Sequence, residues 1–131
     1  MQTFDEFMDV VRKIREHCPW DSVQTHESLK PYMVNETEEV LEGIDILEKE
    51  NDGENLCEEL GDVLFQIALH SVIAQEEGLF TIEDVISGVS SKMKYRHPRI
   101  FSPDDKEAAE LSWDELKARE KAEKRQKHEK C

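Results

Sequence analysis

The chain has 131 residues, and its 31 acidic side chains outnumber 17 Lys and Arg, which gives a formal net charge of −14. This length fits a single domain with one sizeable core. The acidity excludes nucleic acid polymers and anionic membranes as main partners, because both are bound through clustered Lys and Arg.

The compartment is inferred from features that the sequence lacks. No apolar run approaches the roughly 20 residues of a membrane span, and Met1–Arg15 carries too many charges for a signal peptide. Cys18, Cys57 and Cys131 have unrelated spacings, which excludes a disulfide framework and a zinc site. We therefore expect a cytoplasmic protein with no membrane partner.

Apolar residues recur at helical spacing in several segments, separated by turn signals such as Asn51-Asp52-Gly53. The expected helices span residues 4–16, 31–50, 54–77, 81–95 and 110–128. A short element is expected at 25–29 and a loop at 98–109. No segment alternates as a strand does, so the sequence predicts an all-α fold, a bundle of four to five helices.

The two longest helices carry wide apolar stripes. Val34, Leu41 and Ile44 lie on the first stripe, and Leu60 and Ile67 lie on the second. Stripes this wide in a short helical chain favour burial against a second copy, so that dimerisation completes the bundle. A self-contained four-helix bundle is the alternative.

Two pairs of carboxylates lie on the same two helices, Glu36 with Glu39 and Glu59 with Asp62. The spacing within each pair puts both side chains on one face. If the helices pack antiparallel, the carboxylates converge, and their mutual repulsion requires a cation. Oxygen ligands favour Mg²⁺ or Mn²⁺, and Mg²⁺ commonly binds together with substrate phosphates. Solvated acidic helix faces are the alternative, since an acidic chain contains such pairs by chance.

A series of motifs follows a fixed order over residues 4–121. They are Cys18–Leu29, Pro31-Tyr32, Glu36–Glu42, Glu58–Gln66 and Lys92–Phe101, followed by Trp113, Lys117 and Lys121. In these motifs the chain resembles the MazG-type nucleoside triphosphate pyrophosphohydrolases. The resemblance implies an all-α pyrophosphohydrolase domain, which we place at residues 1–114, with a charged helix or tail over 115–131.

The resemblance also implies an activity. Glu36, Glu39, Glu59 and Asp62 are then the metal ligands and the catalytic centre. The implied reaction is the Mg²⁺-dependent hydrolysis of a canonical or non-canonical nucleoside triphosphate between its α and β phosphates, which gives a monophosphate and pyrophosphate. The implied assembly is a homodimer or a homotetramer.

The chain departs from the family pattern at one position. The first motif usually reads Glu-Glu-x-x-Glu, and its first position here is Asn35. A register that begins at Glu38 fits the pattern literally, but Pro31-Tyr32 fixes the ungapped alignment in favour of Asn35. Similar enzymes tolerate a non-acid here, so we expect activity to survive. The alternative is a non-catalytic nucleotide-binding or regulatory relative, with activity weakened by Asn35.

Binding of a triphosphate also requires cations. Lys92, Arg96 and His97 lie near the end of an expected helix and are the candidates for binding the phosphates, with Lys117 and Lys121 behind them. Arg in particular suits bidentate contact with phosphate. A favourable interaction with the helix C-terminal dipole is the alternative role for Lys92 and Arg96.

Two further features have two interpretations each. Trp20 either stacks on a nucleobase or lies buried beneath the first loop. The segment 115–131 holds 4 acidic and 7 basic side chains. Residues 1–114 hold 27 acidic and 10 basic side chains. This cationic segment is either a solvated helix or a lid over the phosphates.

Overall fold

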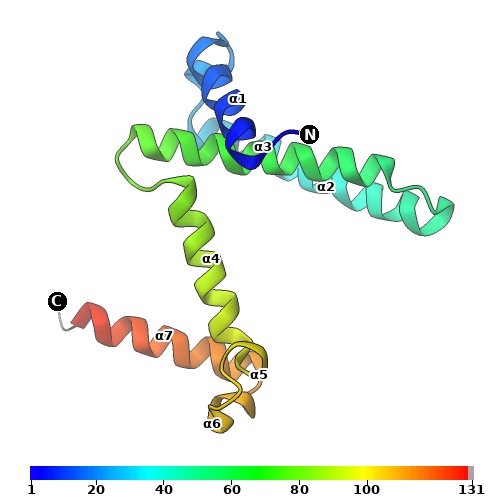
Figure 1. Cartoon of the computed structure of the whole chain (residues 1–131). Coiled ribbons are helices and arrows are strands. Elements are labelled where there is room, and N and C mark those ends of the chain that lie inside the picture. Colours follow the sequence, from blue (N-terminus) through cyan, green and yellow to red (C-terminus); the bar gives the residue numbers. More distant parts are fainter. Residues whose placement is uncertain (130–131) are drawn as a thin grey trace. The chain divides into compact units, whose positions relative to one another are not determined.

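The computed structural model describes residues 1–129, with side chains described through Gln126 (Figure 1). The helices, in chain order, are α1 (Phe4–His17), the 3₁₀ turn η1 (Asp21–Val23), α2 (His26–Glu50), α3 (Glu54–Glu76), α4 (Ile82–Arg96), α5 (Pro98–Phe101), α6 (Lys106–Ala109) and α7 (Trp113–Glu129). Residues 1–129 contain no strand, which confirms the all-α prediction. In this part of the chain, no helix combines the length and the apolar character needed to cross a membrane.

The start of α2 corrects the sequence prediction, which separated a short element at 25–29 from a helix beginning at Pro31. The two form one helix. The Thr25 hydroxyl accepts a hydrogen bond from the Ser28 backbone, and the Ser28 hydroxyl accepts one from the Thr25 backbone. This capping box starts the helix at His26. Pro31 then lies inside the helix, although proline favours the first turn.

The predicted loop at 98–109 contains α5 and α6, so that prediction is wrong for these residues. Pro98 occupies the first turn of α5, and the Asp105 carboxylate caps α6 by accepting a hydrogen bond from the Ala108 backbone. Helices of four residues are too short to show apolar periodicity, which is why the pattern missed them.

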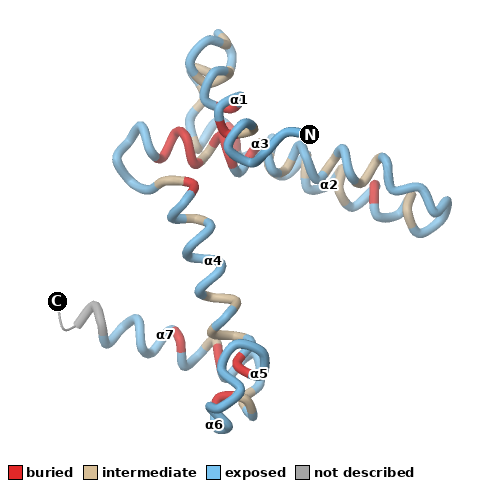
Figure 2. Tube along the Cα trace, in the orientation of Figure 1, coloured by how far each residue is buried: buried red, intermediate tan, exposed pale blue. Residues whose placement is uncertain are grey.

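The chain divides into two compact units, Met1–Ile82 and Glu83–Cys131. In the first unit, α1 and the start of α2 pack on the C-terminal half of α3, where buried positions concentrate (Figure 2). Its buried apolar side chains are Met8, Val11, Leu29, Ala68, Leu69, Val72, Ile73, Ala74 and Ile82. The predicted division at residue 114 concerns domains rather than compact units and stays a prediction. Cys18 and Cys57 are free thiols, and Cys131 lies outside the described residues.

Much of the predicted core face stays exposed in the single chain. Its exposed apolar residues are Val34, Leu41 and Ile44 on α2 and Leu60, Leu64 and Ile67 on α3. We call these six residues the α2–α3 face. Their exposure disfavours the alternative of a self-contained bundle, which would bury these stripes within one chain. The predicted burial against a second copy stays a proposal.

Helices α2 and α3 form an antiparallel hairpin in which the two backbones come close together at Gly43. A Cβ atom at this position would lie 3.0 Å from Leu56 Cα and 3.2 Å from Leu56 N. Because both atoms belong to the backbone, an added methyl group would force the helices apart. We expect Gly43→Ala to lower the free energy of unfolding by about 1–3 kcal/mol, measured by urea denaturation.

Gly61→Ala is the matched control for this substitution. A Cβ atom at Gly61 has no atom within 4 Å, so the helix gains the propensity of Ala, worth about 0.5–1 kcal/mol. If Gly43→Ala were as stable as Gly61→Ala, the close approach would not limit the hairpin.

A histidine pair joins the start of α2 to the last turns of α3. His26 Nδ1 lies 2.8 Å from His70 Nδ1, and His26 Nε2 lies 3.1 Å from Glu77 Oε1. The ring planes differ by 7° and the centroids are 5.1 Å apart, which fits nearly coplanar rings with one shared proton. A second proton would place two N–H groups against each other. Burial lowers the pKa of His70, and the charge of His26 lowers it further.

This pair predicts an acid-sensitive stability. Because the pKa of His70 is lower in the folded chain than its usual value, the unfolded chain binds the proton more readily as the pH falls below about 6.5. When the pH falls from 7.5 to 5.5, we expect the free energy of unfolding of wild type to decrease by on the order of 1 kcal/mol more than that of His70→Asn. Thermal melts at both pH values measure it, with the exposed His17→Asn as control. Equal pH slopes for wild type and His70→Asn would contradict the prediction.

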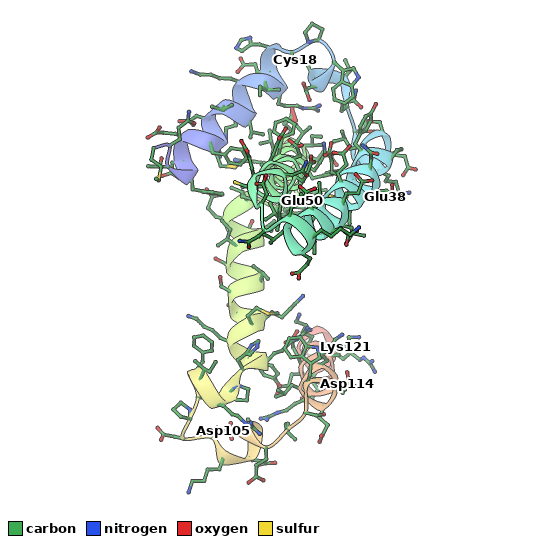
Figure 3. The ribbon with its side chains drawn as sticks, turned by 90° about the vertical axis from the view of Figure 1, so that its right-hand side faces the viewer. Cys18, Glu38, Glu50, Asp105, Asp114 and Lys121 are labelled. Atoms are coloured by element: carbon green, nitrogen blue, oxygen red, sulfur yellow. The ribbon has the colours of Figure 1, made fainter. Side chains whose placement is uncertain are left out.

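In the second unit, the buried side chains of α7 within the described range, through Gln126, are Leu116 and Glu120. The short helices contribute Ala108 and Pro98. Figure 3 labels Asp105, which precedes α6, and Lys121 on α7. Helix α7 confirms the helix expected at 110–128, although it begins three residues later, at Trp113. The proposed lid role of this segment stays a prediction.

Candidate functional site

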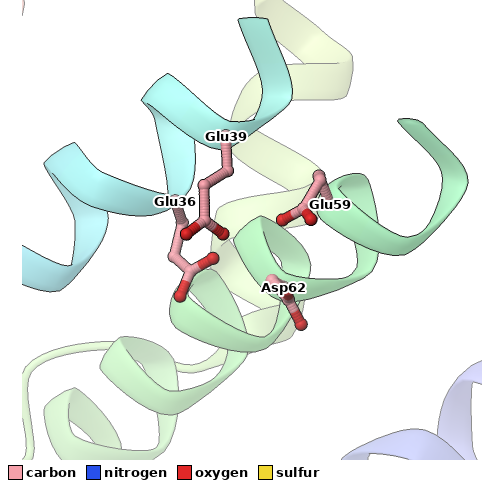
Figure 4. Close-up of side chains that lie close together, drawn as sticks. All are labelled: Glu36, Glu39, Glu59 and Asp62. Atoms are coloured by element: carbon pink, nitrogen blue, oxygen red, sulfur yellow. The ribbon is translucent and has the colours of Figure 1, made fainter. Parts of the chain in front are cut away.

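The four predicted carboxylates converge on the α2–α3 hairpin. Each of Glu36, Glu39, Glu59 and Asp62 offers an oxygen, and these oxygens all lie within 4.8 Å of one another (Figure 4). Spacing along each helix supplies two neighbouring side chains. The turn after α2, in which Asn51 adopts a left-handed backbone with φ of 54°, reverses the chain and brings the second pair against the first.

Two oxygens of this cluster are buried without a partner. Glu36 Oε2 and Glu59 Oε2 are inaccessible to solvent and have no hydrogen-bond partner among the described residues. Glu36, Glu39 and Glu59 are partly buried, and Asp62 is exposed. A buried oxygen without a partner is costly, so the cluster presents acceptors that a ligand would satisfy.

Crowding raises the pKa values of two of these groups, Glu36 and Glu59. A hydrogen bond with Glu39, then burial and the charges of Glu39 and Asp62, raise the pKa of Glu59 to about 7. Burial raises the pKa of Glu36, and the charges of Glu39 and Asp62 raise it further. The protein alone therefore holds these carboxylates under mutual repulsion.

The cluster fits a divalent cation. Its donors are all carboxylate oxygens, which suit hard ions such as Mg²⁺ or Mn²⁺. The partnerless oxygens of Glu36 and Glu59 lie where ligand atoms are needed. Bound there, the cation would also relieve the repulsion that raises both pKa values.

Asn35, the departure from the family pattern, contacts the cluster. Its side-chain Nδ2 donates a hydrogen bond to Glu39 Oε1 over 3.3 Å. An amide at this position donates to Glu39, whereas a glutamate would add a further negative charge to the cluster. The sequence identified the substitution, but not this contact.

The candidate phosphate ligands belong to the second unit and do not share one cavity. Lys92 lines a cavity of about 410 Å³ between α4 and α7. Arg96 and His97 line another of about 260 Å³, together with Trp113. Among the described residues, Lys117 and Lys121 line neither cavity.

Arg96 is more constrained than the sequence suggested. Its guanidinium lies 5.2 Å from the centroid of the Trp113 ring, and His97 packs edge-on against the same ring with centroids 5.5 Å apart. The carboxylate of Glu120 faces it from α7. The sequence did not indicate this contact, because a contact across 24 residues leaves no local pattern.

The position of Trp20 excludes one of the two interpretations of this residue. The residue is 46% exposed, so it is not buried beneath the first loop. Its ring meets the edge of Tyr32, with centroids 5.2 Å apart, and Gln24 donates a hydrogen bond to its carbonyl. The nucleobase role of Trp20 stays a prediction.

Comparison with known proteins identifies a family. Residues 24–101 match the model of the MazG nucleotide pyrophosphohydrolase domain. That range contains all four carboxylates and the candidates Lys92, Arg96 and His97, whereas Trp20, Lys117 and Lys121 lie outside it.

Several relatives align with nearly the whole chain. The uncharacterized protein YabN of Bacillus subtilis is 46% identical over 90% of this chain and 24% of its own length. The nucleoside triphosphate pyrophosphohydrolase/pyrophosphatase MazG of Thermotoga maritima is 44% identical over 93% of this chain and 47% of its own. The nucleoside triphosphate pyrophosphohydrolase of Escherichia coli K12 is 35% identical over 96% of this chain and 49% of its own length. The chain therefore spans half or less of the length of each of these three relatives. With more than half of its residues matched, the chain belongs to the MazG nucleotide pyrophosphohydrolase domain family.

Proposed function

We propose that this chain is a nucleoside triphosphate pyrophosphohydrolase that depends on Mg²⁺ and releases a nucleoside monophosphate and pyrophosphate. The observation that carries the proposal is the convergence of four carboxylates, two of them with buried partnerless oxygens. Family membership and the printed names of the Thermotoga and Escherichia relatives support the reaction type. The cytoplasmic location remains a prediction from the sequence.

The proposed roles follow from charge. A triphosphate carries about four negative charges, which the acidic cluster alone would repel. Glu36, Glu39, Glu59 and Asp62 would hold Mg²⁺ or Mn²⁺, which screens this repulsion and polarises the phosphoryl oxygens. We assign phosphate contacts to Lys92, Arg96 and His97, with Lys117 and Lys121 as further candidates, and contact with the base to Trp20.

A substrate panel tests the proposal. Canonical and oxidised ribo- and deoxyribonucleoside triphosphates are incubated with the protein and Mg²⁺, Mn²⁺ or EDTA, and the products are separated by ion-exchange chromatography. We expect monophosphate and pyrophosphate in equal amounts with either metal and none with EDTA. Diphosphate with orthophosphate, or no product with any substrate and metal, would contradict the proposal.

A nucleotide-binding relative without catalysis is the second candidate, motivated by Asn35. It predicts nucleotide binding without turnover and a large gain of turnover in Asn35→Glu. The hydrogen bond from Asn35 to Glu39 supports the opposite expectation. We expect no gain in Asn35→Glu, because a fifth carboxylate adds repulsion to the cluster.

We also propose that a second copy of the chain covers the α2–α3 face. The six exposed apolar residues of this face lie on the two helices that carry the carboxylates. Several large apolar side chains exposed on the same two helices favour an interface over a solvated surface. A homodimer is the simplest assembly, and a homotetramer requires a second interface in addition to this face.

A further inference from the structure

Among the charged side chains of α7 that the structure describes, through Arg125, Glu120 alone is buried. The side chain of Glu120 is 10% exposed, whereas those of Arg119 and Glu123 are 43% and 52% exposed. Burying a carboxylate is costly unless cations compensate it. The burial of Glu120 therefore depends on its partners.

Those partners are Arg96 and Lys124. Arg96 Nε lies 3.5 Å from Glu120 Oε2, and Arg96 Nη2 donates to Glu120 Oε1 over 3.5 Å. Lys124 Nζ donates to Oε1 over 3.3 Å from the solvent side. Burial alone raises the pKa of Glu120, but the hydrogen bonds and charges of Lys124 and Arg96 lower it below its usual value. Glu120 is thus an anion whose buried partner is Arg96.

The contact leaves part of the guanidinium for another ligand. Arginine has five N–H groups in a rigid plane. Glu120 faces the edge formed by Nε and Nη2, and the central guanidinium carbon lies over the Trp113 ring, 5.2 Å from its centroid. The N–H groups of Nη1 are not engaged by Glu120. Arg96 also lines the cavity of about 260 Å³, so a ligand there can reach it.

We propose that Glu120 is a positioning residue, which fixes the Arg96 guanidinium between its own carboxylate and Trp113 and so directs the remaining N–H groups at a phosphate group of the nucleotide. The inference rests on the proposed binding of phosphate by Arg96. It gives α7 a defined part in substrate binding, whereas the sequence left the segment as a solvated helix or a lid. A guanidinium held on two sides loses less rotational freedom when phosphate binds.

The experiment measures binding and turnover together. Wild type, Glu120→Gln, Arg96→Gln and the double variant are titrated by calorimetry with an α,β-methylene triphosphate in Mg²⁺, and kcat and KM are measured with a hydrolysable substrate. We expect Glu120→Gln to raise Kd and KM about tenfold, with a smaller fall in kcat. In the Arg96→Gln background the same change should alter Kd less than about twofold, because the group it positions is gone.

A matched variant and a spectroscopic signal separate positioning from a structural role. Glu123→Gln removes the same charge one turn further along α7, from an exposed pair with Arg119, and should leave Kd unchanged. In a Trp20→Phe background, the fluorescence of Trp113 reports the guanidinium that lies over it, and Glu120→Gln should shift its emission while Glu123→Gln does not. Glu120→Asp, which keeps the charge but shortens the reach, covers the case in which Glu120→Gln fails to fold.

The outcomes distinguish failure of the positioning role from failure of the proposed function. Unchanged Kd in Glu120→Gln and Glu120→Asp, or an equal effect of Glu120→Gln with and without Arg96, would overturn the positioning role while leaving the proposed function intact. Failure of wild type to bind any triphosphate would overturn the proposed function and this inference with it.

Discussion

Glu59→Gln is expected to lower kcat/KM for triphosphate hydrolysis at least about 100-fold without changing the fold. Residues that merely support metal ligands cost about 10–100-fold when mutated, and Glu59 would be a direct ligand. The amide keeps the size of the side chain but loses the charge and one acceptor. The measurement is pyrophosphate release in Mg²⁺, with circular dichroism as the check on folding.

The control for this variant lies between two of the proposed ligands. Glu38 is exposed on α2 and does not belong to the cluster (Figure 3), so Glu38→Gln removes the same charge and should retain activity. Mg²⁺ gives a second readout, because a ligand at 100 times its Kd stabilises the folded state by about 2.7 kcal/mol. This stabilisation by Mg²⁺ should raise the melting temperature of wild type and of Glu38→Gln. It should leave the melting temperature of Glu59→Gln unchanged. Full turnover by Glu59→Gln would show that the metal assignment is wrong.

Leu41→Glu is expected to convert the assembly into monomers. Leu41 is 58% exposed in the single chain and lies on the α2–α3 face. Burying a Leu is worth about 1.5–3 kcal/mol, and a two-fold interface counts the substitution twice. Dimer dissociation should therefore become at least about 100-fold more favourable, measured by sedimentation velocity across a concentration series.

Leu79→Glu is the matched control for the interface. Leu79 is 65% exposed in the same unit but does not belong to the α2–α3 face, so this variant should assemble as wild type does. A monomeric wild-type protein, or equal dissociation of both variants, would contradict the proposed interface.

The sequence predicted those features that depend on local spacing. Five long helices are present where apolar periodicity indicated them, and Glu36, Glu39, Glu59 and Asp62 converge as their spacing on an antiparallel hairpin requires. The boundary at Pro31 was wrong, because the Thr25–Ser28 capping box outweighs the preference of proline for a first turn.

Contacts between distant segments had no local signature. The pairing of His26 with His70 spans 44 residues, and the burial of Glu120 depends on Arg96 in another helix. Neither follows from composition or periodicity, since a histidine or glutamate on a helix face looks the same with or without a partner. The apolar stripes were identified, but periodicity does not distinguish burial within one chain from burial between two chains.

The central claim is that carboxylates of α2 and α3 hold a divalent cation. Anomalous diffraction from crystals grown with Mn²⁺ and a non-hydrolysable triphosphate tests it most directly. We predict an anomalous peak coordinated by oxygens of Glu36, Glu39, Glu59 and Asp62 and by the phosphates, absent from Glu59→Gln crystals. A structure that binds the nucleotide with no peak at these carboxylates, or with its manganese held elsewhere, would contradict the account.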